Sequence, residues 1–219
     1  MPNPIITLDR IARLYGTFAA LRDITLTVDA GTSLLLHGEN GAGKSTLLKL
    51  LSGLNTPTHG KLTVFGEDPH DVRARIAYMS HAPMLYDELT ALENLHYFAS
   101  LHPEPQALNP AQALLDVGLD PALPRRVSEY SQGMRQRASL ARVLLTNPDL
   151  LLLDEPFSNL DVASAAAMIA RLRTYLATPS ASGEPRTLIL TTHQHDLARP
   201  LATRTITLQQ GRIAFDISK

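Results

Sequence analysis

The chain has 219 residues, 44% of them hydrophobic, which is enough for one sizeable core or for one domain with an insertion. The formal net charge of −1 leaves no basic footprint for nucleic acid, and the absence of cysteine excludes disulfides and thiol catalysis. The first residues lack the pattern of a secretion signal, and no apolar run approaches the ~20 residues that span a bilayer. We therefore expect a chain that does not itself cross a membrane and does not bind nucleic acid.

The first part of the chain predicts strands on either side of a glycine-rich loop. Residues 23–31 alternate between apolar and polar side chains, which is typical of a half-exposed strand. Residues 32–37 (TSLLLH) do not alternate and predict a strand that is buried on both faces. After the loop, leucines at helical spacing predict a helix that stops at Gly53. These leucines are Leu47, Leu50, Leu51 and Leu54. Short strands are predicted at 60–68 and 75–79.

The middle of the chain predicts a run of helices. Thr90 and Glu93 have the spacing of a capping box, in which each side chain bonds the other's backbone N–H. Asn109 precedes a second helix start, and Ser131 precedes a third helix. These signals predict that the stretch from about 90 to 145 is mainly helical.

Strand signals return after these helices. Residues 150–154 predict a buried strand, and a long alanine-rich helix is predicted to begin near Asp161. Residues 178–185 predict a flexible connector, residues 186–193 another buried strand, and residues 203–216 a hairpin.

The order of these elements predicts one α/β domain over residues 1–219. Residues 82–140 would form an inserted helical subdomain, while residues 1–81 and 141–219 would form the core around it. No internal repeat or low-complexity segment interrupts this organisation.

The glycine-rich loop at 38–45 (GENGAGKS) has the G-x-x-x-x-G-K-[ST] spacing of a phosphate-binding loop, between a predicted strand and a predicted helix. Its glycines let successive N–H groups turn inward, where they form an anion site with the positive end of the helix. Lys44 can add a charge for the β- and γ-phosphates, Ser45 can ligate Mg²⁺, and Thr46 can hydrogen-bond phosphate. The alternative is a glycine-rich turn that matches by chance, and the loop alone does not distinguish a kinase, a GTPase or an ATP-driven motor. The candidate nucleotide-binding residues are Gly38, Glu39, Asn40, Gly41, Ala42, Gly43, Lys44, Ser45 and Thr46.

Two acidic residues, Asp154 and Glu155, follow an apolar run directly. Because a buried parallel strand ends at the crevice where ligands bind, Asp154 can hold Mg²⁺ through water and Glu155 can activate or orient an attacking water. His193 ends another apolar strand and could hydrogen-bond the γ-phosphate or the same water. The alternative for each is an ordinary solvated strand end, and His195 is expected to be a surface residue.

The stretch YSQGMRQRASLARVLL predicts a second anion site, far along the chain from the first. Ser131 and Gly133 open a helix, so that a hydroxyl and free N–H groups converge at its positive end. One face of this helix would be lined by Met134, Ala138, Ala141 and Leu145. Its polar side would carry Arg135, Arg137 and Arg142. The alternative is an ordinary capped amphipathic helix.

These motifs resemble those of the ATP-binding subunit of an ABC transporter, in the same order and over essentially the whole chain. GENGAGKS resembles its phosphate loop, YSQGM its LSGGQ signature, and LLLLDEP its Walker B strand with the catalytic glutamate. SNLD at 158–161 resembles the D-loop, TTH at 191–193 the switch histidine, and Tyr15 the aromatic residue that stacks on adenine. The resemblance implies an α/β fold: a P-loop NTPase (RecA-like) core with an N-terminal antiparallel β subdomain and an inserted α-helical subdomain.

The resemblance also implies how the motifs work. Two such subunits would pair head-to-tail around two ATP molecules, with Mg²⁺ at each site. Ser131 and Gly133 of one subunit would act in trans on the γ-phosphate of the other, and Asp161 of the D-loop would belong to the nucleotide site. Three signature positions depart from the family pattern, namely Tyr130, Gln132 and Met134, whereas Ser131 and Gly133 are kept.

His81 stands where these subunits usually have the glutamine of the Q-loop, which ligates Mg²⁺ and shifts with the membrane partner. Because Mg²⁺ prefers oxygen ligands, we expect His81 to reach the metal through water or to serve mainly as a hinge. A solvated polar loop residue is the alternative. A histidine here, followed by LTALENLHYF at 89–98, resembles the haem-exporter ATPase subunit of the Ccm cytochrome c maturation system.

The leading hypothesis is therefore an ATP-hydrolysing motor subunit, peripheral on the cytoplasmic face of the cell membrane. It would work as a dimer, expected to be a homodimer, and would drive a separate membrane permease. The alternatives are the ATPase subunit of another short ABC exporter, a soluble ABC ATPase without a membrane partner, and a P-loop kinase or GTPase switch. The signature helix and TTH argue against the last of these.

Overall fold

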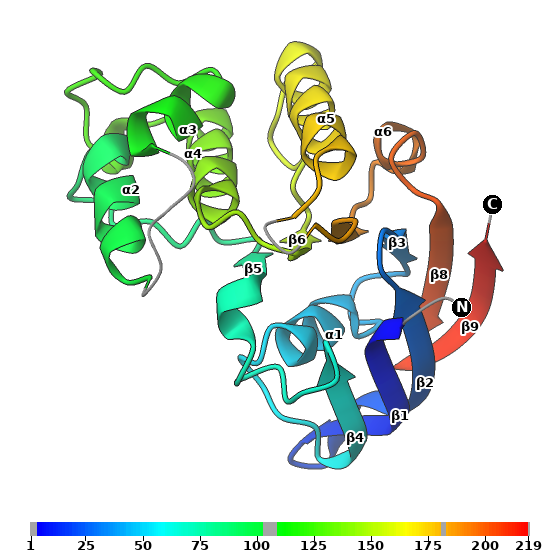
Figure 1. The fold of residues 1–219 in the computed structure, drawn as a ribbon. Helices are drawn as coiled ribbons and strands as arrows, with labels where there is room; N and C mark the ends of the chain where they lie inside the picture. The colour runs from blue at the N-terminus through cyan, green and yellow to red at the C-terminus, as the bar shows by residue number, and fades with distance from the viewer. Residues whose placement is uncertain (1–3, 103–108, 181–182, 219) are drawn as a thin grey trace.

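The computed structural model describes residues 4–102, 109–180 and 183–218, so two residues of the predicted connector, 181 and 182, lie outside it. This part of the chain forms a six-stranded sheet in the order β5-β6-β7-β3-β8-β9 and a three-stranded sheet in the order β2-β1-β4 (Figure 1). The strands are β1 (Pro4–Tyr15), β2 (Phe18–Asp29), β3 (Ser33–His37), β4 (His59–Val64), β5 (Ile76–Met79), β6 (Leu150–Asp154), β7 (Thr187–Thr191), β8 (Arg204–Gln209) and β9 (Arg212–Ser218). The helices are α1 (Lys44–Leu51), α2 (Ala91–Ser100), α3 (Pro110–Asp116), α4 (Gln132–Leu145), α5 (Val162–Ala177) and α6 (His195–Ala198), with short 3₁₀ turns at Arg73–Arg75 and Val127–Glu129.

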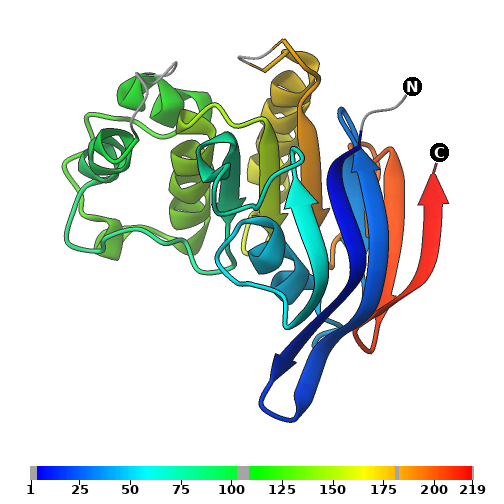
Figure 2. The same cartoon turned by 60° about the horizontal axis from the view of Figure 1, so that its bottom comes forward.

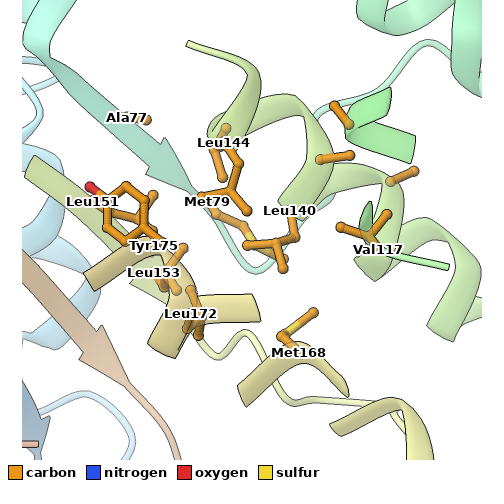
Figure 3. Packing of buried hydrophobic residues seen from close by; sticks show 14 of the residues in the cluster. Ala77, Met79, Val117, Leu140, Leu144, Leu151, Leu153, Met168, Leu172 and Tyr175 are labelled. Atoms are coloured by element: carbon orange, nitrogen blue, oxygen red, sulfur yellow. The ribbon is translucent and has the colours of Figure 1, made fainter. Parts of the chain in front are cut away.

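The six-stranded sheet is parallel from β5 through β8 and antiparallel only where β8 pairs with β9. Its central strands are buried on both faces, as the unbroken apolar runs predict. In β6, Leu151 and Leu153 face a core that includes residues of α4 and α5 (Figure 3). The alternate residues Leu150 and Leu152 face a second core, which includes residues of α1 and the three-stranded sheet. The sheet is thus the middle layer of the molecule, which Figure 2 shows from the side.

The sequence analysis did not predict β1, the central strand of the smaller antiparallel sheet. Its buried residues Ile6 and Leu8 are two apart, but the next buried apolar residue is Ile11. The register shifts between Leu8 and Ile11, where Arg10 has a positive φ of 49°. This bulge breaks the period of two by which a strand is recognised in a sequence.

The helix after the glycine-rich loop is shorter than the leucine spacing predicts. It ends at Leu51, and the turn that follows contains Gly53 with a φ of 73°, so the predicted stop at this glycine is confirmed. Leu54 lies beyond the helix and is 58% exposed, so its assignment to the helix was wrong. The other three predicted leucines are buried.

Three helices, α2, α3 and α4, gather on one side of the molecule (Figure 1). Each begins at the predicted residue: Thr90 forms a capping box with Glu93, Asn109 caps α3, and Ser131 caps α4. The subdomain limit placed at residue 140 falls inside α4, which continues to Leu145. Within the described residues, no helix has both the length and the apolar character needed to cross a bilayer.

The three arginines of α4, predicted to form its polar side, are partly enclosed by other parts of the chain. All three are half-buried, and each bonds a different part of the surrounding structure. Arg135 pairs with Asp87 at 2.7 Å, Arg137 donates to the Gly118 carbonyl at 2.8 Å, and Arg142 donates to the Tyr78 carbonyl at 3.1 Å. Burial lowers the pKa of Arg142 to about 10.

Candidate active site

One pocket of about 650 Å³ brings together predicted site residues from widely separated parts of the chain. The predicted residues that line it are Tyr15, Asn40, Gly41, Ala42, Gly43, Lys44, Ser45, Thr46, His81, Asp154, Glu155 and His193. This convergence follows from the strand order, because β6, β7 and β3 are neighbours and end at the same edge of the sheet. The glycine-rich loop follows β3, the acidic pair closes β6, and His193 follows β7.

The glycine-rich loop needs glycine at positions that pack tightly against the chain. A Cβ atom at Gly43 would lie 2.6 Å from the Ala20 carbonyl oxygen, and one at Gly38 would lie 2.4 Å from the Leu208 carbonyl oxygen. Both residues also have positive φ, 105° at Gly43 and 147° at Gly38. The loop is therefore compact, and the Lys44 side chain contacts backbone carbonyls of the loop itself. The ammonium group donates to the carbonyl oxygens of Gly38 at 2.6 Å and Glu39 at 3.0 Å.

The carboxylate of Asp154 is buried and held from two neighbouring strands. Thr191 of β7 donates its hydroxyl to Asp154 Oδ1 at 2.7 Å, and the Tyr78 hydroxyl of β5 lies 3.4 Å from Oδ2. Burial raises the pKa of the Tyr78 phenol well above its ordinary value, and the adjacent Asp154 charge raises it further. Tyr78 therefore stays a hydrogen-bond donor to this carboxylate at physiological pH.

Glu155 has a left-handed backbone, with φ at 54°, and this conformation is uncommon for a residue with a side chain. Its backbone N–H donates to the Thr191 hydroxyl oxygen at 3.0 Å. The carboxylate reaches His193, accepting from the backbone N–H at 3.1 Å and lying 3.4 Å from the ring Nε2. The strained turn after β6 thus directs the Glu155 carboxylate toward the pocket and His193.

Aromatic residues of the β1–β2 hairpin form one wall of the pocket. Tyr15 and Phe18 are register partners across the two strands, and both are largely exposed. The Tyr15 hydroxyl accepts from the Asn55 amide at 2.9 Å, and the Arg13 guanidinium lies 4.8 Å from the Tyr15 ring centroid. Two flat faces are therefore available for a base to stack on.

Sequence reasoning missed several residues of the site. Phe18, Ala20 and Ser158 also line the pocket, and Thr191 positions both acidic residues from outside the lining. A second aromatic residue only three positions after Tyr15 was a usable signal for Phe18. The role of Thr191 depends on strand pairing between β6 and β7, which no local pattern reveals.

Five predicted site residues lie outside the pocket lining: Gly38 and Glu39 at the start of the glycine-rich loop, and three residues from other parts of the chain. Ser131 caps α4 by accepting from the Met134 N–H, and Asp161 caps α5 by accepting from the Ser164 N–H. That same hydrogen bond lowers the pKa of the Asp161 carboxyl. Gly133 packs against the segment before α5, where an added Cβ would lie 3.4 Å from the Asn159 carbonyl oxygen. Within one chain these residues therefore do not join the pocket.

His195 is not the free surface residue that the sequence predicted. It is half-buried, and its ring stacks edge-on against that of His37, with 4.1 Å between the ring centroids. His37 is the last residue of β3, directly before the glycine-rich loop. The contact therefore joins the start of α6 to the strand that carries the loop.

Comparison with known proteins identifies the relatives of this fold and site. The family profile described as ABC transporter matches residues 21–158. A cytochrome c biogenesis ATP-binding export protein CcmA of Xanthomonas oryzae pv. oryzae is 38% identical over 83% of each chain. A Nod factor export ATP-binding protein I of Rhizobium johnstonii is 36% identical over 94% of this chain and 67% of its own. A phosphonates import ATP-binding protein PhnC of Anaeromyxobacter dehalogenans is 33% identical over 98% of this chain, which spans 46% of that protein.

Solved structures agree with these relatives. An ATP-binding subunit of an ABC transporter superposes with a TM-score of 0.83 and 28% identity, over 98% of this chain and 90% of that one. A dimeric ATP-binding cassette in a post-hydrolysis state, bound to ADP and Pi, has the same fold, with a TM-score of 0.84 and 23% identity over 97% and 98% of the two chains. These matches confirm the predicted P-loop NTPase fold with its antiparallel β and helical parts. The chain belongs to the ABC transporter family, as an ATP-binding and ATP-hydrolysing domain.

Proposed function

We propose that this protein is the motor subunit of a membrane transporter, which pairs with a second ATPase subunit around two ATP molecules. The observation that carries this proposal is the single pocket in which the phosphate loop, the acidic pair and His193 meet. Conformational change on ATP binding and hydrolysis would then be passed to a separate permease. The protein would then lie at the cytoplasmic face of the cell membrane, as a peripheral subunit.

In this proposal ATP lies with its base against the aromatic wall and its phosphates in the loop. Tyr15 and Phe18 offer ring faces for adenine, and Lys44 offers the positive charge for the β- and γ-phosphates. The loop backbone and the start of α1 add N–H donors at a positive helix end. On binding, Lys44 would exchange the loop carbonyls for phosphate oxygens.

The residues of the pocket fit Mg²⁺. Ser45 and Asp154 both line it, and hydroxyl and carboxylate oxygens are the donors that this ion prefers. Bound Mg²⁺ would offset the charge that develops on the phosphate oxygens. His81 lines the same pocket but offers only nitrogen, so we assign it an indirect contact through water or a hinge role.

Glu155 is the residue that we assign to the attacking water. Its carboxylate faces the pocket, where it can accept a proton from that water or orient it toward the γ-phosphate. His193 lies against the same carboxylate and can hydrogen-bond either the water or the phosphate. The backbone held by Thr191 keeps Glu155 in this position without help from the nucleotide.

The second subunit would supply Ser131 and Gly133 to the ATP that this chain binds. Their distance from their own chain's pocket supports this arrangement, because they offer an anion site at a helix start that their own nucleotide does not use. Asp161 would lie at the same interface. We expect two identical chains, related by the twofold symmetry that most soluble homo-oligomers have.

The substitution Glu155→Gln tests the hydrolytic role. It keeps the shape of the side chain but cannot take a proton, so we expect hydrolysis to fall by roughly 10²- to 10⁴-fold. ATP binding, measured by titration calorimetry, should persist, and the ATP-bound dimer should last longer in size-exclusion chromatography. Glu67→Gln, an exposed glutamate outside the pocket, is the matched control. Normal phosphate release by Glu155→Gln would remove this residue from the assigned role.

We further propose that the transporter serves haem export in cytochrome c maturation. The support is the 38% identity to the CcmA relative over 83% of each chain, together with the histidine at position 81. Other relatives are named for phosphonate import and for Nod factor export, so transport of a different substrate is the competing assignment. An ABC ATPase that works without a membrane partner is the other competitor.

Cell experiments separate these assignments. A tagged full-length chain should co-purify with membranes and with a permease, and purification free of any membrane protein would favour the ATPase without a membrane partner. Cells that carry only the Glu155→Gln variant should lose covalently haem-labelled cytochromes in a peroxidase stain. Normal cytochrome staining in those cells, with the permease still bound, would favour another transported substrate.

A further inference from the structure

One buried polar side chain joins the signature helix to the turn that carries Glu155. Gln136 lies in the second turn of α4 and is only 3% exposed. Its amide nitrogen donates to the carbonyl oxygens of Glu155 at 3.0 Å and Pro156 at 3.1 Å. Only the nitrogen of a glutamine amide can donate, so these two contacts use both of its hydrogens.

These contacts complete the fixation of the Glu155 backbone. The N–H side is held by Thr191, and the carbonyl side also accepts from the Ser158 hydroxyl at 2.9 Å. With φ at 54°, the residue keeps its conformation only while its neighbours oppose a return to the ordinary region. Three side chains therefore hold the Glu155 backbone, those of Thr191, Ser158 and Gln136, and of these Gln136 comes from helix α4.

The position of Gln136 on α4 links it to the second anion site. The helix begins at Ser131, five residues earlier, and Gly133 packs on Asn159 and Leu160 just beyond the Glu155 turn. Figure 3 shows Leu140 and Leu144 of the same helix directed into the core that also holds Leu153 of β6. Helix α4 therefore carries the residues proposed to meet the partner's nucleotide, and it also contacts the turn that holds Glu155 of its own chain.

We infer that Gln136 is a positioning residue, which holds the Glu155 carboxylate of its own subunit in the geometry for water attack. This inference rests on the role proposed for Glu155. The chemistry requires an amide here, because an apolar side chain of equal size would fill the space but leave two buried carbonyls without this donor. Gln136 is not among the residues that line the pocket, and it acts through the turn that it bonds.

The test is the substitution Gln136→Met, which preserves volume and removes the donors. We expect kcat for ATP hydrolysis to fall by roughly 10- to 100-fold, because misplacing a reacting group by about 1 Å costs up to that much. The affinity for ATP, measured by calorimetry, should match that of the unaltered chain, since the phosphate loop is not touched. Gln112→Met is the matched control, because Gln112 is an exposed glutamine whose side chain bonds Asp116 on its own helix α3.

The ATP-bound dimer distinguishes positioning from simple support of α4. If Gln136 positions Glu155, the Gln136→Met dimer should outlast that of the unaltered chain, as expected for Glu155→Gln. If Gln136 only stabilises helix α4, the ATP-bound dimer of the variant should instead dissociate sooner than that of the unaltered chain, and this result would overturn the inference. Unchanged kcat would overturn it as well, whereas hydrolysis by Glu155→Gln would overturn the proposed role of Glu155 itself. Should the methionine variant not fold, Gln136→Asn keeps the amide one methylene short of the turn, and the same drop in kcat is expected; full activity would refute the inference.

Discussion

His37 is a titratable residue at the base of the phosphate loop, and its surroundings disfavour its charged form. Burial lowers the pKa of its imidazole from the ordinary 6.5, and the nearby charges of His195, Lys44 and His193 lower it further. The folded chain therefore binds a proton at this position less readily than the unfolded chain does. Acidification therefore favours the unfolded chain, in which His37 takes up its proton more readily.

We predict that stability drops as the pH falls below about 6.5, and that His37→Gln reduces this drop. The unfolded chain takes up the proton first, so the contribution of neutral His37 is complete above that pH and is lost on the acid side. Melting temperatures measured from about pH 8 to about pH 5, the range in which histidine titrates, check the prediction. His59→Gln, an exposed histidine on β4, is the control. Superimposable pH profiles for His37→Gln and the unaltered chain would contradict the sign worked out here.

At the residue scale, most of the pocket could be predicted because its chemistry is local in sequence. The phosphate loop is a continuous stretch, and Asp154 with Glu155 directly follows an apolar run. Thr191 and Gln136 could not be predicted, because each acts on Glu155 across a pairing or packing contact that joins distant segments. Their roles emerged only once β6, β7 and α4 had been placed together.

At the element scale, helix α2 depends on a buried asparagine. Asn94 is fully buried, and its side chain accepts from the Tyr86 N–H at 2.8 Å and donates to the Tyr86 carbonyl at 3.0 Å. It also donates to the Thr90 carbonyl at 2.9 Å. One side chain therefore ties the helix to the loop that leads from His81 into the helical part of the molecule.

We predict that Asn94→Ala lowers the free energy of unfolding by roughly 1–3 kcal/mol, because the backbone N–H and carbonyl of Tyr86 lose their hydrogen-bond partner. Urea unfolding followed by circular dichroism measures this loss. ATP affinity should be unchanged, since Asn94 is not part of the pocket lining. His96→Ala, at an exposed position on the same helix, should leave the unfolding midpoint in place. Equal midpoints for the two variants would show that the Tyr86 contacts contribute nothing.

Elements with regular periods could be predicted, and elements with irregular ones could not. The caps at Thr90, Asn109 and Ser131 and the apolar central strands agree with the sequence analysis. The strand β1 was missed because its bulge near Arg10 interrupts the alternation. Likewise, Leu54 fits the helical spacing of its neighbours although the chain has already turned away from α1.

At the scale of the whole molecule, the proposed dimer gives each chain two tasks, one at its own pocket and one at its partner's. Ser131 would serve the second task in this proposal, since it lies outside the pocket lining of its own chain. Its hydroxyl also caps α4, so a substitution has a structural cost as well. A test of its function must therefore separate ATP binding by one chain from events that need two.

We predict that Ser131→Ala leaves ATP binding by the single chain unchanged but lowers turnover by roughly 10²-fold, as expected when a donor to a transition-state charge is lost. ATP-dependent dimerisation, followed by size-exclusion chromatography, should weaken in parallel. The lost cap should cost about 1 kcal/mol in urea unfolding, which is too little to explain the loss of turnover. Ser128→Ala, an exposed serine nearby, is the control. Full activity in Ser131→Ala would contradict the action in trans.

The strand order also determines when this site can exist during synthesis of the chain. The strand that carries the phosphate loop, β3, has β7 and β8 as its two neighbours, and both belong to the last fifth of the sequence. A nascent chain that ends before Thr187 therefore holds a complete loop motif on a strand with no partner at either edge. Nucleotide cannot help such an intermediate to fold, because the surface that would hold it is assembled only after β7 and β8 have been synthesised. The unfinished apolar strands must instead be shielded from one another until the C-terminal segments arrive.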